Sequence, residues 1–232
     1  MDRYVSNPFT ILLFAIFIAV LLLLIPLFFF GLIGSALAKL GFTLGEALLI
    51  FIFILVGSFI NIPLTTIESP VTVLRREYSF FGMFYRIREV SPTTVLAINV
   101  GGAVIPTAIS LYLFSVGFGM MGVTFLISAL VGVAVVTFIT NRVAQPVEGL
   151  GIATPFFVPP LAALFVGLVL AWGEPMAAPL IAYVSGTLGT LIGADLLNLK
   201  EIGRLGAPVA SIGGAGTFDG IFLSGIIAAF LA

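Results

Sequence analysis

Residues 176–198 of this chain read MAAPLIAYVSGTLGTLIGADLLN, an apolar stretch that is long enough to cross a membrane as a helix and that contains one aspartate, Asp195. Six further apolar stretches occupy residues 9–35, 44–65, 92–115, 118–140, 152–172 and 207–231. Of the 232 residues, 61% are hydrophobic and 8% are charged, whereas about 25% are charged in a typical soluble protein. We therefore predict an all-α membrane protein with seven transmembrane helices, some broken at glycine or proline, that form one integral membrane domain over residues 1–232.

Positive charges gather on one side of this predicted topology. The side that bears the N-terminus carries all the arginines and one lysine, whereas the opposite side carries only Lys39. Loops rich in lysine and arginine stay on the cytoplasmic side of a membrane. We therefore expect a protein of the cell membrane with a cytoplasmic N-terminus and an external C-terminus. The charges on the cytoplasmic side are Arg3, Arg75, Arg76, Arg86, Arg88, Arg142, Lys200 and Arg204.

The longest polar stretch is the loop from Glu68 to Ser91, which is basic and partly alternating, with Gly82 at its centre. Two interpretations are open. The stretch is either a basic cytoplasmic loop that fixes the topology, or a hairpin along the membrane surface whose arginines meet anionic headgroups.

Two pairs of segments suggest an internal repeat. GSFINIPL at 57–64 is similar to GTLIGADL at 189–196, and NVGGAVIPT at 99–107 is similar to SIGGAGTFD at 211–219. The partners lie four spans apart and so share one orientation. This suggests parallel repeats over residues 9–115 and 152–231, linked by the span 118–140. Asn99, Gly101 and Gly102 also indicate a break in the third span, which is either a packing kink or part of a ligand site.

Asp195 and Asp219 lie within the last two apolar stretches. An ionisable group at membrane depth costs about 2.5–3.5 kcal/mol on insertion scales, so it is a functional hypothesis by default. The chain has no histidine and no cysteine, which excludes serine–histidine dyads, HExxH zinc sites and thiolate metal sites. The structural alternatives are that Asp195 reaches the interface at the end of its span and that Asp219 caps a helix N-terminus.

The sequence before Asp219 does not suit a regular helix, because Pro208 and the glycines at 213, 214 and 216 interrupt it. A helix that starts near Thr217, after an extended segment, would place Asp219 in its first turn, where the two carboxylates could meet across a wet pocket. Carboxylates held close together share one proton, so that one acts as base and the other as acid. This arrangement can activate water against a peptide bond. We predict Asp195 and Asp219 as catalytic residues, and Gly213, Gly214, Gly216 and Thr217 as the approach for an unwound substrate helix.

These residues favour an intramembrane aspartyl protease, a hydrolase whose partners are membrane lipid and a transmembrane peptide substrate. A secondary transporter that binds a cation or relays protons through the same aspartates is the alternative, and a membrane scaffold without catalysis is a third. We expect no metal and no cofactor, and the net charge of −1 suggests no nucleic-acid partner.

The segment Gly216-Thr217-Phe218-Asp219-Gly220-Ile221-Phe222-Leu223-Ser224 resembles the GxGD segment of intramembrane aspartyl proteases of the presenilin and signal-peptide-peptidase type. A glycine three residues before the aspartate matches Gly216, although Phe218 stands where that family has a second glycine. The resemblance covers roughly the last 45 residues and implies that Asp195 is the first catalytic aspartate, near the cytoplasmic end of its span. The whole chain also resembles an uncharacterised family of prokaryotic multi-pass membrane proteins.

Overall fold

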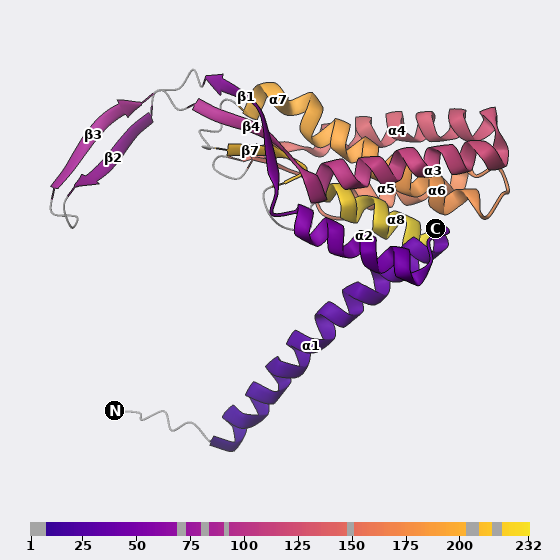
Figure 1. Cartoon of the computed structure of the whole chain (residues 1–232), viewed down its shortest axis with the longest axis horizontal. Coiled ribbons are helices and arrows are strands. Elements are labelled where there is room, and N and C mark those ends of the chain that lie inside the picture. Colours follow the sequence, from indigo (N-terminus) through magenta and orange to yellow (C-terminus); the bar gives the residue numbers. More distant parts are fainter. Residues whose placement is uncertain are drawn as a thin grey trace.

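The computed structural model describes residues 8–68, 73–79, 84–90, 93–147, 151–202, 209–214 and 220–232, and of residues 73–79, 84–90, 151 and 202 it describes the backbone. The helices form a bundle with a small sheet at one end, and the first helix projects from the bundle (Figure 1). In chain order they are α1 (Pro8–Lys39), α2 (Leu44–Gly57), α3 (Ile105–Met121), α4 (Val123–Val143), α5 (Val158–Leu170), α6 (Ala177–Thr190), α7 (Leu199–Ile202) and α8 (Gly220–Leu231).

The predicted apolar stretches correspond to these helices, because each stretch overlaps a different one of the helices longer than α7, although the stretch 118–140 also includes the last residues of α3. Four helical segments are long and apolar enough to cross a membrane, namely Pro8–Lys39, Val100–Met121, Val123–Val143 and Ala177–Glu201. Helices α2, α5 and α8 are apolar but shorter, with 14, 13 and 12 residues. The prediction of a mostly helical chain is confirmed, and four of its helical segments are able to cross a membrane by their length and composition.

Helix α6 lies at the centre of the bundle. Its residues are buried along almost its whole length, against α3, α4, α5 and α8. Glycines allow this close packing: a Cβ added at Gly189 would lie 2.6 Å from the Cβ of Val136 on α4. On another side of α6, a Cβ added at Gly186 would lie 3.0 Å from the carbonyl oxygen of Ser224 on α8. Small residues that let helix backbones approach are the usual means of helix association in membranes.

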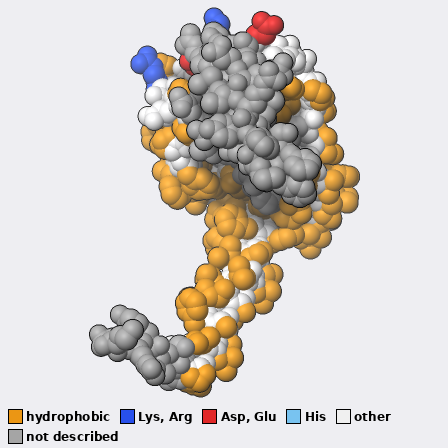
Figure 2. Space-filling model, turned by 90° about the vertical axis from the view of Figure 1, so that its left-hand side faces the viewer, with side chains coloured by type: hydrophobic (Ala, Val, Ile, Leu, Met, Phe, Trp, Pro, Cys, Tyr) orange, Lys and Arg blue, Asp and Glu red, His pale blue; other side chains and the backbone are white. Residues whose placement is uncertain are grey.

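Helix α1 differs from the rest because it is exposed along most of its length. Its buried residues are Ile33, Ala36 and Leu37, near its C-terminal end. Figure 2 shows α1 emerging from the body as a separate column of hydrophobic side chains. At its last residue, the Lys39 ammonium donates a hydrogen bond of 2.6 Å to the carbonyl oxygen of Phe230 near the end of α8. A cation there satisfies a helix C-terminal carbonyl and complements the helix dipole.

The strands correct the expectation of an all-α protein. They are β1 (Asn61–Glu68), β2 (Val73–Ser79), β3 (Phe84–Val90), β4 (Thr93–Asn99), β5 (Gln145–Val147), β6 (Gly151–Ala153) and β7 (Val209–Ile212). They form a three-stranded sheet in the order β1-β4-β7 and two two-stranded sheets, β2-β3 and β5-β6. Strand β4 pairs antiparallel with β1 and parallel with β7, with Ile98 opposite Ile212.

Four of the strands, β1, β4, β6 and β7, occupy ends of stretches that we predicted to be transmembrane helices, namely 44–65, 92–115, 152–172 and 207–231. Their β-branched residues suit a strand as well as a helix. These segments form strands because each one pairs through backbone hydrogen bonds with another segment of the chain. Strands β2 and β3 of the basic loop pair antiparallel, with Val73 opposite Val90. This pairing agrees with a hairpin, and whether the loop lies along the membrane surface stays a prediction. Gly82, at its predicted centre, lies outside the described residues.

The two segment pairs behind the predicted repeat behave differently. Residues 57–64 end in strand β1, whereas residues 189–196 are helical throughout. The second pair is more alike, because β4 and β7 lie side by side in parallel and each comes before a helix in the chain, α3 and α8.

Candidate functional site

Asp195 ends a π-helical turn, Leu191–Asp195, which continues α6 toward the end of the bundle where the sheet lies. Side-chain amides hold this turn. Asn198 Nδ2 donates to the carbonyl oxygens of Gly193 at 3.0 Å and Ala194 at 2.9 Å, and Asn141 Nδ2 on α4 donates to Gly193 at 3.1 Å. Turns of this kind leave backbone groups that need other partners, and they are frequent at functional sites. The half-buried Asp195 is therefore held on a supported turn.

The Asp195 carboxylate reaches the strand that leads toward α8. Its Oδ2 accepts a hydrogen bond of 2.7 Å from the backbone N–H of Gly213, the residue after β7. Gly213 has φ +83°, which favours glycine, and a Cβ added there would lie 2.6 Å from the Cβ of Ala103. Glycine is required at this position both for its backbone conformation and for its space. The predicted site residues Asp195 and Gly213 are thus in direct contact, and Gly214, with φ +80°, follows immediately.

A polar network fixes the sheet beside Asp195. Asn99, at the end of β4, donates through Nδ2 to the Ser58 carbonyl at 2.8 Å and to Asn61 Oδ1 at 3.0 Å, and its own Oδ1 accepts from the Gly102 N–H at 2.7 Å. The Ser211 hydroxyl on β7 donates to the same Asn61 oxygen at 2.6 Å. Asn61 on β1 therefore joins the ends of all three strands, so the predicted break at 99–102 is a capped transition from strand to helix.

Hydroxyl groups join α6 to α8, the helix that begins directly after Asp219 in the chain. Thr190 Oγ1 and Ser224 Oγ lie 3.0 Å apart, within hydrogen-bond distance. The Ser224 hydroxyl also donates a hydrogen bond of 3.1 Å to the Gly186 carbonyl oxygen. All three residues are buried. These contacts fix the first half of α8 against the helix that carries Asp195.

A cavity of about 240 Å³ lies at the start of α8. Its lining includes Gly220, Leu223 and Ser224 from the first turns of α8 and Thr154 from the segment after β6. Thr154 and Ser224 are the two residues of this lining that carry hydroxyl groups. A space of this size holds several water molecules, each of which needs about 30 Å³.

The structure brings some of the predicted site residues together and does not describe the others. Asp195, Gly213 and Gly214 meet where the end of the π-helical turn contacts the end of β7. Gly216, Thr217 and Asp219 lie outside the described residues. The described residues agree with the expected extended segment before the last helix, because Val209–Ile212 is a strand and Gly220–Leu231 is helical. The predicted start of that helix near Thr217 lies outside the described residues.

The sequence reasoning missed the asparagines that support the site. The side-chain amides of three asparagines join segments or donate to backbone carbonyls, namely Asn61, Asn141 and Asn198. The signal in the sequence was a polar amide within or beside an apolar stretch. Such an amide at the end of an apolar helix needs hydrogen-bond partners once it is buried.

The described residues also bear on metal binding. Within residues 8–68, 73–79, 84–90, 93–147, 151–202, 209–214 and 220–232, no three histidine, cysteine or acidic side chains gather as a metal site would require. The groups placed at the described part of the site are one carboxylate, backbone N–H groups, amides and hydroxyls, which can orient water and a peptide by hydrogen bonding.

The chain belongs to a family described as proteins of unknown function (DUF1614), whose sequence profile matches residues 55–231. The matched region contains Asp195, Asp219 and every asparagine of the network above, and it begins after most of α1 and α2. Among curated proteins and among solved structures, nothing matches the chain.

Proposed function

We propose that this protein is an intramembrane aspartyl protease that hydrolyses peptide bonds of membrane-spanning substrates, with Asp195 and Asp219 as the two carboxylates that activate water. The proposal starts from the cost of an ionisable side chain at membrane depth, about 2.5–3.5 kcal/mol, which needs a functional reason. It adds the absence of histidine and cysteine from the whole chain, which leaves carboxylates as the natural acid and base.

One observation carries the proposal. Asp195 Oδ2 accepts a hydrogen bond of 2.7 Å from the N–H of Gly213, and Gly213 lies six positions before Asp219 in the chain. The contact ties the segment that contains the second aspartate to the turn that contains the first. On the other side of that segment, Ser224 and Thr190 tie α8 to α6. Both ends of the segment that contains Asp219 are thereby attached to the helix of Asp195.

The chemistry needs one proton shared by two carboxylates. The ionised carboxylate takes a proton from water, and the resulting hydroxide oxygen bonds to the carbonyl carbon of the peptide while the other carboxyl group donates its proton to the carbonyl oxygen. When the tetrahedral diol collapses, the first carboxyl group protonates the leaving nitrogen and the second carboxylate takes a proton back from a diol hydroxyl. The pair then again holds one proton, and no metal or covalent intermediate is involved.

The glycines contribute in different ways to this proposal. The space that a side chain at Gly213 would need is occupied by Ala103, so Gly213 acts through its N–H on Asp195. Gly214 and Gly216, with Thr217, keep the proposed role of admitting a substrate backbone close to the carboxylates.

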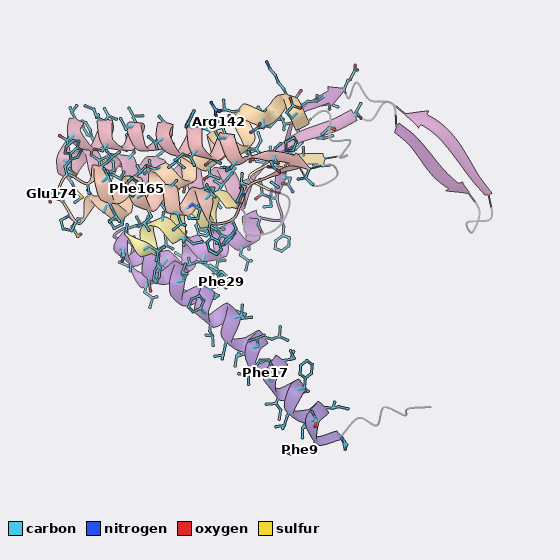
Figure 3. The ribbon with its side chains drawn as sticks, turned by 180° about the vertical axis from the view of Figure 1, so that it is seen from behind. Phe9, Phe17, Phe29, Arg142, Phe165 and Glu174 are labelled. Carbon is cyan, nitrogen blue, oxygen red and sulfur yellow. The ribbon has the colours of Figure 1, made fainter. Side chains whose placement is uncertain are left out.

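We propose seven transmembrane segments with a cytoplasmic N-terminus and an external C-terminus. Helix α8 has 12 residues, or about 18 Å at 1.5 Å per residue, and the hydrocarbon layer is about 30 Å thick. The preceding strand β7 can supply the missing depth, because its backbone pairs with β4 and is not left to lipid. On this assignment β7 and the first turn of α8 lie at membrane depth. The charges agree with it, because Arg142 lies in the last turn of α4, toward the sheet end (Figure 3), whereas Lys39 binds the Phe230 carbonyl near the C-terminal end of α8.

A second candidate function, secondary transport, is favoured by the parallel pairing of β4 with β7. Each strand precedes a helix, and breaks at corresponding positions of two repeats are a usual site for substrate and ion in transporters. In that function Asp195 would bind a cation or a proton. Uptake of ²²Na⁺ or a pH-sensitive dye response in sealed vesicles would distinguish it from hydrolysis.

The proposed protease is tested by cleavage of a tagged single-span protein with the purified chain reconstituted in lipid vesicles. The wild type should release a product whose new terminus maps within the span. Asp195→Asn and Asp219→Asn should each abolish it, because neither variant can complete the proton transfers. Glu174→Gln is the matched control, since Glu174 is an exposed carboxylate after α5, and it should cleave as the wild type does.

Product from either asparagine variant at the wild-type rate would refute the proposal. If a folded wild type gives no product over a panel of single-span proteins, and ion uptake depends on Asp195, transport is the correct function.

A further inference from the structure

A side chain of α4 holds the π-helical turn that carries Asp195. Asn141, near the C-terminal end of α4, donates a hydrogen bond of 3.1 Å through Nδ2 to the carbonyl oxygen of Gly193. Gly193 lies within the turn Leu191–Asp195, two positions before the aspartate. In Figure 3, Arg142 marks this end of α4, on the side of the bundle where the sheet lies. The hydrogen bond joins residues 52 positions apart in the chain, so it fixes the turn against a separate helix.

The close approach of the turn to α4 depends on Gly193. A Cβ added at Gly193 would lie 2.5 Å from the Thr137 carbonyl oxygen and 3.0 Å from the Thr140 Cβ. The two backbones are therefore near enough for a short amide side chain on α4 to reach a carbonyl inside the turn. Gly193 is buried and Asn141 is half-buried. A carbonyl and an amide in such a place need each other as partners, because little water reaches them.

Two other polar side chains on the same face of α4 do not hold the turn. The hydroxyl oxygens of Thr137 and Thr140 are buried, and neither has a hydrogen-bond partner within the described part of the chain. Of these three polar residues of α4, Asn141 is therefore the one that binds the turn. The second donor to the Gly193 carbonyl, Asn198 at 3.0 Å, follows the turn in the same segment and moves with it.

The register of the turn decides where the Asp195 carboxylate points. Successive residues of a helix are rotated by about 100° and raised by about 1.5 Å, and a π-helical turn differs from an α-helical one in register by one position. A change of one position would rotate Asp195 by about that angle and take its carboxylate away from the Gly213 N–H, which it now meets at 2.7 Å. The amide of Asn141 opposes this change, because the carbonyl that it binds lies inside the turn.

We propose that Asn141 is a positioning residue, which fixes the direction of the Asp195 carboxylate through the Gly193 carbonyl. The inference rests on the proposed function, in which Asp195 exchanges protons with water and the substrate. It makes α4 part of the catalytic apparatus, although Asn141 acts through Asp195 and not on the substrate. A misplacement of about 1 Å costs a reaction about 10²-fold in rate. Loss of the Asn141 amide should therefore slow the chemical step and leave substrate binding unchanged.

Electron paramagnetic resonance reports on the turn independently of cleavage. The chain has no cysteine, so a nitroxide on Leu197→Cys labels one position of the full chain in lipid vesicles and leaves Asp195 intact. Leu197 is 57% exposed and lies two residues after Asp195, and Leu168 on α5, at 54%, is the control position. In Asn141→Leu the share of a second, more mobile spectral component at 197 should rise about fivefold, the factor that one lost hydrogen bond gives. The spectrum at 168 should not change.

Two matched variants separate positioning from general packing. Asn141→Gln keeps an amide donor on a longer side chain, so it should restore most of the wild-type spectrum and rate. Thr140→Val keeps the shape of a buried neighbour of Asn141 and removes a hydroxyl that has no partner among the described residues, so it should change neither. Asn141→Ala, with a strong helix former, replaces Asn141→Leu if the leucine variant does not fold.

Cleavage of the tagged single-span protein gives the second measurement. Asn141→Leu should lower kcat about tenfold to a hundredfold with KM unchanged. An unchanged spectrum at 197, an unchanged kcat, or an equal effect of Thr140→Val overturns the proposal. If the wild type cleaves nothing, the proposed function fails, and the spectra at 197 still decide whether Asn141 holds the turn of Asp195.

Discussion

Gly213→Ala is the substitution that the geometry of the site specifies most closely. Gly213 has φ +83°, and an alanine in this left-handed region costs about 1–2 kcal/mol. The added Cβ would lie 2.6 Å from the Ala103 Cβ, about 1 Å inside the usual carbon–carbon contact of 3.5–4.0 Å. Overpacking of a closely packed site costs about 1–3 kcal/mol. We therefore expect Gly213→Ala to lower the free energy of unfolding by about 2–5 kcal/mol.

A matched control separates the two contributions. Gly173, in the turn after α5, also has φ +83°, but a Cβ added there meets nothing within 4 Å. Gly173→Ala should therefore lose only about 1–2 kcal/mol. Adding Ala103→Gly to Gly213→Ala should recover little of the steric part, because the added Cβ would still lie 2.7 Å from the backbone nitrogen of residue 103 and 2.8 Å from the carbonyl carbon of Gly102.

The assay is unfolding by SDS in mixed detergent micelles, followed by far-ultraviolet circular dichroism, with cleavage of the single-span protein measured below the transition. Because the substitution displaces the N–H that binds Asp195, Gly213→Ala should also lose cleavage while the fold persists, whereas Gly173→Ala should keep it. Equal loss of stability in the two variants would refute the close contact between Gly213 and Ala103. Full cleavage by Gly213→Ala would refute the functional importance of the hydrogen bond to Asp195.

Three further substitutions test the elements around the site by the same unfolding assay. Asn198→Leu leaves two carbonyls of the π-helical turn without their amide donor and should cost about 1–3 kcal/mol. Lys39→Met removes the hydrogen bond to the Phe230 carbonyl and should cost about 1 kcal/mol. Thr43→Ala removes the capping box with Glu46 at the start of α2 and should cost about 0.5–2 kcal/mol without changing cleavage.

The helices could be predicted from the sequence because their signal is local. Long apolar runs with almost no charge have few structural solutions in a membrane, so the stretch 118–140 and the helix Val123–Val143 largely coincide. The boundaries were harder. The stretch from Thr93 to Asn99 is apolar and β-branched, which suits helix or strand equally, and its partner in the sheet, Val209–Ile212, lies more than a hundred residues away in the chain. No local pattern contains that pairing.

Of the contacts at the candidate site, one could be expected from the sequence and another could not. The contact between Asp195 and Gly213 follows from a carboxylate and a glycine-rich segment near the same end of neighbouring spans, which the sequence reasoning had associated. The amide of Asn141 was not anticipated, because its acceptor is the Gly193 carbonyl in a turn that only the packing of α4 on α6 brings near. An asparagine in an apolar stretch indicates that its amide needs a hydrogen-bond acceptor, but the sequence does not identify which backbone carbonyl will accept the bond.

The hydrogen bond from Gly213 to Asp195 admits a structural explanation as well as a catalytic one. A buried N–H after the last residue of β7 needs an acceptor, and the carboxylate supplies it. An asparagine at 195 would keep an oxygen in the same place, so a purely structural role predicts that Asp195→Asn is nearly neutral for both stability and function. Hydrolysis instead requires a group that can take up and release a proton, which an amide cannot do. Retained stability together with abolished cleavage in Asp195→Asn is therefore the combination that only the catalytic role explains.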